Sequence, residues 1–310
     1  MEPLRPRINI HNTACLRALC MLLCGAFFIT GCSQQVPPKP RKLMAIPSAL
    51  QEIHVLNDRS ALLAKLRFTG TVNLTLTGHH GDTSSFQANA VLLVDQNRVP
   101  HLLLVGTYLG QDAFEMGMNR HIYWLIDHQH KIAYVGRVAL ADRVPAGVMP
   151  LRPQRVLQML GITPLIISDQ TRIAMFNVPH SGRYNLLLLN SGGGSLDHIK
   201  RQISISRYTG QVRQVRLYDR RGRVIAYSDL SDYHPLDRAF DGVELPARIV
   251  IHYLDAQAEM DFHVRHAVLH FPGKSAFIFA SPSFQGLKVA DMDNHANWRI
   301  TVSPGRAGRK

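Results

Sequence analysis

Apolar and polar residues alternate along much of this chain with a period of two, which is the spacing of a β-strand with one buried face. In residues 68–76, side chains such as Phe68 and Leu74 lie on one face, and threonines such as Thr71 lie on the other. Residues 86–94 repeat the pattern. The chain is therefore expected to build its core on one side of a sheet.

Further strands are predicted at short intervals along the chain. They span residues 101–107, 112–118, 121–127, 131–136, 172–177, 183–190, 198–206, 211–218, 223–229, 245–253 and 259–271. Because most of the links contain only a few turn residues, consecutive strands must run antiparallel as a meander. In the last strand the apolar phase shifts after Val264, which predicts a β-bulge near His266.

Two segments have helical spacing instead. Residues 47–66 place apolar side chains at intervals of three and four, and residues 152–160 predict a short helix that ends at Gly161. With many strands, few helices and no βαβ spacing, the predicted fold is mainly β. It is a strongly curved antiparallel sheet that forms an open, or half, β-barrel with helices in or across its mouth.

Residues 1–31 have the parts of a secretory signal peptide, because arginines precede an apolar run that ends in small residues. The run has about 12 residues, whereas a membrane-spanning helix needs ~20. Its exit, Ile29-Thr30-Gly31-Cys32, resembles the lipobox of bacterial lipoproteins. This resemblance implies that Cys32 receives a diacylglycerol and becomes the first residue of the mature chain. The alternative is an ordinary signal peptide followed by an incidental cysteine.

The remaining residues divide into a tether and a folded body. Residues 32–46 contain the lipidated cysteine and a proline-rich stretch, which favours an extended chain. Residues 47–310 are expected to form a single domain with a sizeable core. The cysteines all lie in or at the end of the signal segment, so disulfides are not expected. Ser33 after the cysteine favours the periplasmic face of the outer membrane, by the rule known for enteric bacteria.

The net charge of +13 falls to near +11 when three arginines and one glutamate leave with the signal peptide. Such a chain attracts anions, and anionic lipid headgroups or cell-wall polymers are natural candidates for an exported protein, whereas nucleic acid is not an expected partner. The basic residues are scattered along the sequence and form no dense cluster.

No catalytic or metal-binding signature stands out. The histidines form three groups, none of which has zinc-site spacing: His79 and His80; His128 and His130; His263, His266 and His270. The sequence contains no Gly-x-Ser-x-Gly elbow. We therefore expect no enzymatic activity, no metal, and no cofactor other than the covalent lipid on Cys32.

The apolar face of a curved sheet can hold acyl chains, or the same side chains can fill a solid core. Periodicity alone does not separate these alternatives. The residues predicted to line a cavity are Val72, Leu74, Leu92, Leu102, Leu104, Trp124 and Leu217.

Three stretches carry a resemblance to a known family. They are HLLLVGTYLG at residues 101–110, QRVLQMLG at residues 154–161, and the segment 215–249, in which VRLY precedes a turn and LPARI opens a strand. With the order of helices and strands, they resemble the outer-membrane lipoprotein receptor and the periplasmic carrier of the lipoprotein-localisation pathway, the LolB/LolA superfamily.

The resemblance implies an open β-barrel with a helical lid that binds acyl chains of lipoproteins or lipids and helps deliver them to the outer membrane, with a periplasmic carrier as a possible partner. In the receptor, an exposed hydrophobic residue between the third and fourth strands helps cargo enter the membrane. The matching position is Leu109, beside Tyr108, although this turn could instead fold into the core. The alternative function is a scaffold lipoprotein with a filled β core.

Overall fold

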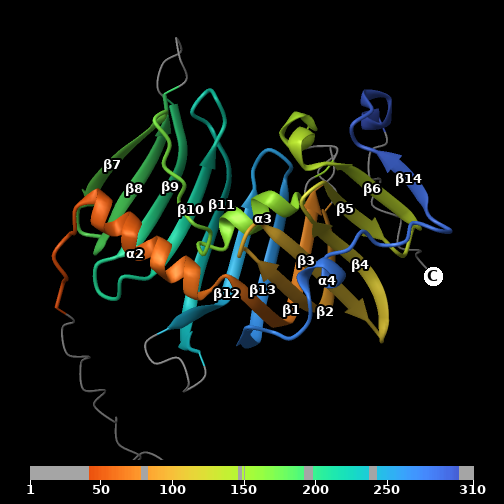
Figure 1. Cartoon of the computed structure of the whole chain (residues 1–310), viewed down its shortest axis with the longest axis horizontal. Coiled ribbons are helices and arrows are strands. Elements are labelled where there is room, and N and C mark those ends of the chain that lie inside the picture. Colours follow the sequence, from red (N-terminus) through yellow and green to blue (C-terminus); the bar gives the residue numbers. More distant parts are fainter. Residues whose placement is uncertain are drawn as a thin grey trace, which may run out of the picture. The chain divides into compact units, whose positions relative to one another are not determined.

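One sheet of 14 strands organises the part of the chain that the structure, a computed structural model, describes (Figure 1). The described residues are 42–77, 83–145, 149, 151–191, 198–236 and 243–299. The predicted signal peptide, Cys32, and the histidines His79 and His80 lie outside them. Within the described ranges, no helix combines the length and the apolar character needed to cross a bilayer.

Two antiparallel meanders make up most of the sheet. The first contains β1 (Lys65–Thr77), β2 (Thr83–Asp95), β3 (His101–Tyr108), β4 (Gln111–Met118), β5 (Ile122–Asp127) and β6 (Ile132–Arg137). The second contains β7 (Thr171–Val178), β8 (Arg183–Asn190), β9 (His198–Ser206), β10 (Val212–Tyr218), β11 (Val224–Pro235), β12 (Glu244–Tyr253) and β13 (Ala258–Leu269). The meanders join where β1 pairs with β13.

The sheet stays open because its edge strands, β7 and β14 (Lys288–Asp291), are not paired with each other. The predicted mainly β, open and curved sheet is confirmed. One detail differs, because β14 runs parallel to β6, whereas only antiparallel pairs were expected. This pairing is made by a four-residue strand that returns after a long crossover from β13, and so short a strand carries little periodic signal.

The predicted bulge lies in β13. Thr69 pairs with His266 and Gly70 pairs with Val264, so Arg265 is the extra residue. A Cβ built on Gly70 would lie 1.9 Å from the backbone oxygen of His263, which is far inside van der Waals contact. The bulge therefore depends on the absence of a side chain at Gly70.

Helix α2 (Ala49–Leu62) begins at a capping box formed by Ser48 and Gln51. It ends four residues before the predicted boundary, because the chain turns at Leu63 and enters β1. Its buried residues are Glu52, Ile53, Leu56 and Ser60, whereas Leu50 and Leu62, two of the apolar side chains with helical spacing, are exposed. Helix α3 (Pro153–Met159) matches the short helix predicted between the meanders.

Helices α2 and α3 cover one side of the sheet, which we call the inner face (Figure 1). We call the opposite side the outer face. Ile53 of α2 and Val156 of α3 belong to the same hydrophobic cluster as the inward side chains of both meanders. The core therefore lies between the inner face and the two helices, as expected for a sheet with one apolar side.

The segment after β13 packs against the first meander. It contains α4 (Ser275–Ile278), β14 and the 3-10 helix η4 (His295–Arg299). Another 3-10 helix, η3 (Val138–Arg143), lies earlier in the chain, between β6 and α3. Phe284 and Leu287 pack on a second hydrophobic cluster formed by Trp124, Ile126 and Ala133. This cluster lies on the outer face of β5 and β6.

Replacing Gly70 tests the junction between the meanders. Gly70→Ala is expected to lower the free energy of unfolding by about 1–3 kcal/mol, the usual cost of overpacking, because the new methyl group meets backbone that cannot move aside easily. Thr71→Ala, one residue away, is the control and should change stability by less than about 0.5 kcal/mol. Denaturant unfolding of both variants measures the difference, and equal stabilities would contradict this account of the bulge.

Candidate functional site

Six of the seven predicted lining residues lie together in the inner-face cluster. Leu92 of β2 pairs with Phe68 of β1 on one side and with Leu104 of β3 on the other, so these side chains form a row across three strands. Leu217 contributes from β10 in the second meander. All six are buried: Val72, Leu74, Leu92, Leu102, Leu104 and Leu217.

Trp124 does not belong with them, and its assignment to the inner face was wrong. It lies in the second cluster on the outer face, over Gly117, and its indole Nε1 donates a hydrogen bond to Oε1 of Glu115 at 2.7 Å. The neighbouring Tyr123 faces inward instead. Because the C-terminal segment buries the outer face here, both residues are buried, and the sequence pattern could not show which one pointed inward.

Polar contacts attach both helices to the inner face. The hydroxyl of Tyr184 on β8 donates to Oε2 of Glu52 on α2 at 2.7 Å. On α3, the carbonyl oxygen of Gln158 accepts a hydrogen bond from Arg201 on β9, and that of Met159 accepts one from Ser228 on β11. These side-chain hydrogen bonds add to the apolar packing of both helices on the inner face, where side chains such as Ile53 and Val156 are buried.

Glu52 is the buried acid of this arrangement. Burial raises the pKa of Glu52 above its usual value of 4.5, and the hydrogen bond from Tyr184 acts in the opposite direction with the smaller effect. The neutral form of this carboxyl group is therefore more stable, relative to the charged form, than it is for an exposed glutamate.

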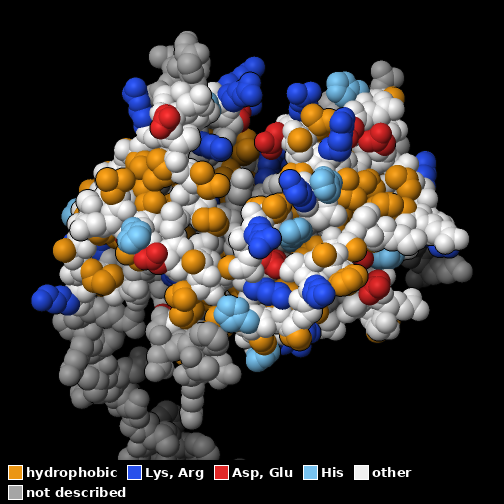
Figure 2. Space-filling model, viewed as in Figure 1, with side chains coloured by type: hydrophobic (Ala, Val, Ile, Leu, Met, Phe, Trp, Pro, Cys, Tyr) orange, Lys and Arg blue, Asp and Glu red, His pale blue; other side chains and the backbone are white. Residues whose placement is uncertain are grey.

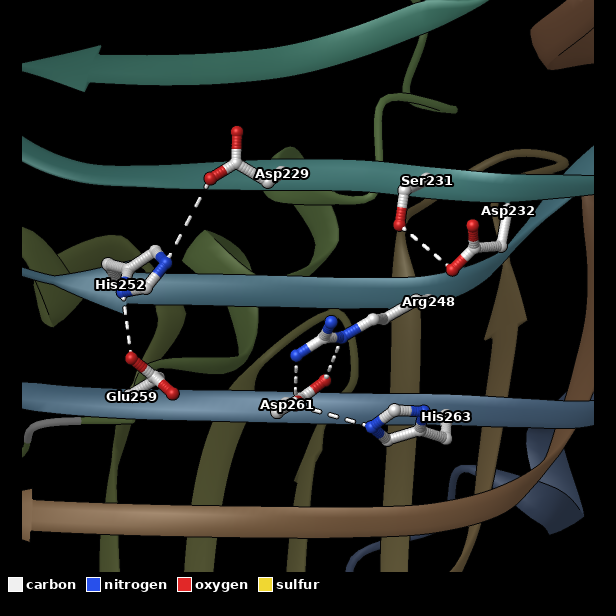
Figure 3. A network of polar contacts seen from close by, with 8 residues as sticks. All are labelled: Asp229, Ser231, Asp232, Arg248, His252, Glu259, Asp261 and His263. Atoms are coloured by element: carbon white, nitrogen blue, oxygen red, sulfur yellow. Dashed lines mark hydrogen bonds and ion pairs between the residues drawn. The ribbon is translucent and has the colours of Figure 1, made fainter.

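The outer face of β11, β12 and β13 carries paired charges (Figure 3). Arg248 binds the carboxylate of Asp261 through two nitrogen atoms, at 3.2 and 2.9 Å. His252 lies between Glu259, at 3.0 Å, and Asp229, at 3.9 Å. In the described part of the chain, no group of three or more His, Cys, Asp or Glu side chains is arranged to hold a metal ion.

The hairpin between β3 and β4 exposes the residue predicted to insert into membranes. Leu109 is 86% exposed, and both Leu109 and Gly110 have positive φ angles, of 51° and 80°. A left-handed conformation costs a residue with a Cβ roughly 1–2 kcal/mol. Leu109 therefore lies at the tip of a tight turn and does not fold into the core, while the half-exposed Tyr108 packs its ring near Phe86.

A hollow of about 270 Å³ opens beside the bulge. Its lining includes Thr69, Val91, Val105 and Arg265, whose neighbours in the sheet show that the hollow lies on the outer face.

On the surface shown in Figure 2, exposed hydrophobic side chains form separate groups, with lysines and arginines spread between them.

These features define a class of fold: an open, curved β-sheet with short helices across its apolar side. A DUF1329 family protein from Desulfovibrio piger shares this fold, with a TM-score of 0.50 at 9% identity over 74% of this chain and 95% of that one. At such low identity, the likeness concerns the fold alone.

Two further solved structures are similar. A LolA superfamily protein from Nitrosomonas europaea has a TM-score of 0.48 at 12% identity, over 76% of this chain and 99% of its own. A domain described as an outer membrane lipoprotein-sorting protein, from Vibrio parahaemolyticus, has a TM-score of 0.49 at 10% identity, over 73% and 95%. No family model and no curated protein sequence matches the chain. The fold that the resemblance implied, an open, curved sheet with helices across its apolar side, is the fold that the structure has.

The Glu52 contact predicts a pH dependence. A carboxyl group whose pKa is higher in the folded than in the unfolded protein binds more protons when folded. Its stabilising contribution is therefore complete below the unfolded pKa and is lost as the pH rises through the raised, folded value. Glu52→Gln should remove this part of the dependence.

Denaturant unfolding of both proteins at a series of pH values between 4 and 8 measures the effect. The stability of Glu52→Gln relative to the unchanged protein should rise with pH.

A second variant tests the hydrogen bond itself. Tyr184→Phe should lower the free energy of unfolding by about 1–3 kcal/mol, because it leaves the buried Glu52 without its donor. Tyr227→Phe, whose ring stacks on His252 at the outer face, is the matched control. Parallel pH profiles for Glu52→Gln and the unchanged protein would contradict this assignment.

Proposed function

We propose that this protein is a lipid-anchored envelope protein that binds acyl chains of lipoproteins or lipids on its inner face and helps deliver them to the outer membrane. The observation that carries the proposal is the wide, mostly apolar inner face of an open sheet, covered by two short helices, of which α2 keeps one side exposed to solvent. Binding needs no reacting side chain, because burial of each methylene group contributes about 0.8 kcal/mol.

The proposed anchor is a diacylglycerol on Cys32, which lies outside the described residues. The prolines between Cys32 and the body favour an extended tether, so the body would stay close to the membrane. The proposed location is the periplasmic face of the outer membrane, and a periplasmic carrier would supply the cargo.

One observation favours a second candidate, a scaffold lipoprotein with a filled core. The six lining residues on the inner face are no more than 8% exposed, and the hollow beside the bulge opens on the outer face. Binding in the manner proposed would therefore require α2 or α3 to move and open the inner face, whereas a scaffold would need no such movement.

Acyl binding is tested on residues 43–310, which form one compact unit. We expect this body to bind a fluorescent fatty acid and to carry lipid detectable by mass spectrometry after purification. Leu104→Trp should weaken binding by about tenfold, because it fills space at the inner face. Val105→Trp, on the adjacent outward position, is the control and should bind normally.

Thermal unfolding of both variants would verify that they are folded. If the unchanged body neither carries lipid nor binds the fatty acid, the carrier proposal fails and the scaffold candidate is favoured.

The hairpin tip gives a separate test of membrane insertion. Leu109→Asn should reduce binding of the full chain to phospholipid vesicles by about tenfold or more, because a leucine side chain contributes roughly 1.5–3 kcal/mol when buried. It should not lower stability, because asparagine tolerates the left-handed conformation. The test uses a Cys32→Ser background, which removes the proposed anchor. Phe277→Asn, at a site 78% exposed on α4, is the control, and equal loss in both variants would argue against a special role for Leu109.

A further inference from the structure

One arginine lies on the apolar inner face with little to compensate its charge. In the sheet, Arg201 of β9 pairs with Leu188 of β8 and with Leu217 of β10, both of which belong to the inner-face cluster. Arg201 is only 8% exposed. Its guanidinium therefore lies among inward-facing leucines beneath α3.

The hydrogen bonds of Arg201 are incomplete. Its Nη2 donates to the carbonyl oxygen of Gln158 at 2.7 Å, and its Nε has no partner among the described residues. A guanidinium has five N–H donors, and a single neutral carbonyl oxygen uses one of them. Burial lowers the pKa of Arg201 to about 10, with no contribution from an acidic neighbour, so the group remains a cation at neutral pH.

A neighbouring arginine shows how the fold treats a buried cation that serves structure. Arg155, on α3, is bound by both carboxylate oxygens of Asp255, at 3.0 and 2.7 Å. Arg201 has no such acid among the described residues. Burying an unpaired charge costs free energy, so the position of Arg201 indicates that an anion from outside the protein binds there.

Other groups around α3 also have donors to spare. Arg152, which precedes α3, donates to the carbonyl oxygen of Val144, and its Nε has no partner in the part of the chain that the structure describes. In the same part of the chain, the buried hydroxyl groups of Tyr123 and Tyr253 have no partner either. The polar groups around the helix therefore offer more hydrogen-bond donors than the protein itself satisfies.

We propose that Arg201 receives the anionic headgroup of a lipid whose acyl chains lie on the inner face. This inference rests on the proposed acyl-binding function and specifies the ligand. An oxyanion, whether a carboxylate or a phosphate, would replace the Gln158 carbonyl oxygen on the guanidinium and form charge-assisted hydrogen bonds. The diacylglyceryl thioether of a lipoprotein carries no charge, so the preferred cargo is an anionic lipid.

The test compares ligands that have the same acyl or alkyl chain length and a charged or an uncharged headgroup. Native mass spectrometry of the full chain in a nonionic detergent would measure binding of palmitate against hexadecanol, and of phosphatidylglycerol against diacylglycerol with the same chains. We expect the charged member of at least one pair to bind at least about tenfold more tightly, the factor typical of a hydrogen bond to a charged group. The pair with the larger ratio identifies a carboxylate or a phosphate as the headgroup.

Substitutions assign the preference to its residue. Arg201→Met should bring the ratio close to one while leaving binding of the uncharged ligand within about twofold, because only the charge-assisted bonds are lost. Arg201→Lys should keep part of the preference. Arg216→Met, on β10 at an outward position next to Leu217, is the matched control and should keep all of it.

Each outcome decides a different point. Equal binding of charged and uncharged ligands by the unchanged protein would overturn the inference even if Arg201→Met did not fold. An undiminished preference of Arg201→Met for charged ligands would also overturn the inference. If this variant also had a lower melting temperature, the role of Arg201 would be to hold α3 on the sheet. Failure to bind any of the four ligands would overturn the acyl-binding function itself.

Discussion

Pairing between β1 and β13 joins the two meanders into a single sheet. The two strands lie far apart in sequence, and their register runs from Leu66 opposite Leu269 to Leu76 opposite Ala258. Each meander alone would leave an edge strand unpaired at this junction. The close approach at Gly70 and the bulge at Arg265 keep both strands in the register that turns Phe68 and Phe262 toward the same core, where their rings meet edge to face.

Once the meanders are joined, the inner face becomes one wide apolar surface that must be covered. Two helices of 14 and seven residues cover it, and the polar contacts of Tyr184, Arg201 and Ser228 fix them in place. Helix α2 keeps one side exposed to solvent, so it can open at a smaller cost than α3, none of whose residues is exposed. The same arrangement thus combines a stable sheet with a site that a lipid could enter, and it accounts for polar side chains on an otherwise apolar face.

The two faces of the sheet treat charge differently. On the outer face of the second meander, arginine, histidine and acidic side chains neutralise one another in contact with solvent (Figure 3). On the inner face, Arg201 has one carbonyl oxygen and, among the described residues, no acidic partner. Because desolvation makes an unpaired charge far more costly inside than outside, the inner arginine is the stronger indication of a ligand.

The sequence by itself determined most of the secondary structure and the bulge, because alternation and helical spacing are local properties of the chain. It also placed Leu109 in a turn between two strands. Only the tertiary structure decided which sides of these elements are covered. Trp124 is buried on the outer face because the C-terminal segment covers it there, and Leu50 is exposed because of the position of α2. The parallel pairing of β14 and the burial of Arg201 arise from contacts between distant segments, and no local pattern encodes them.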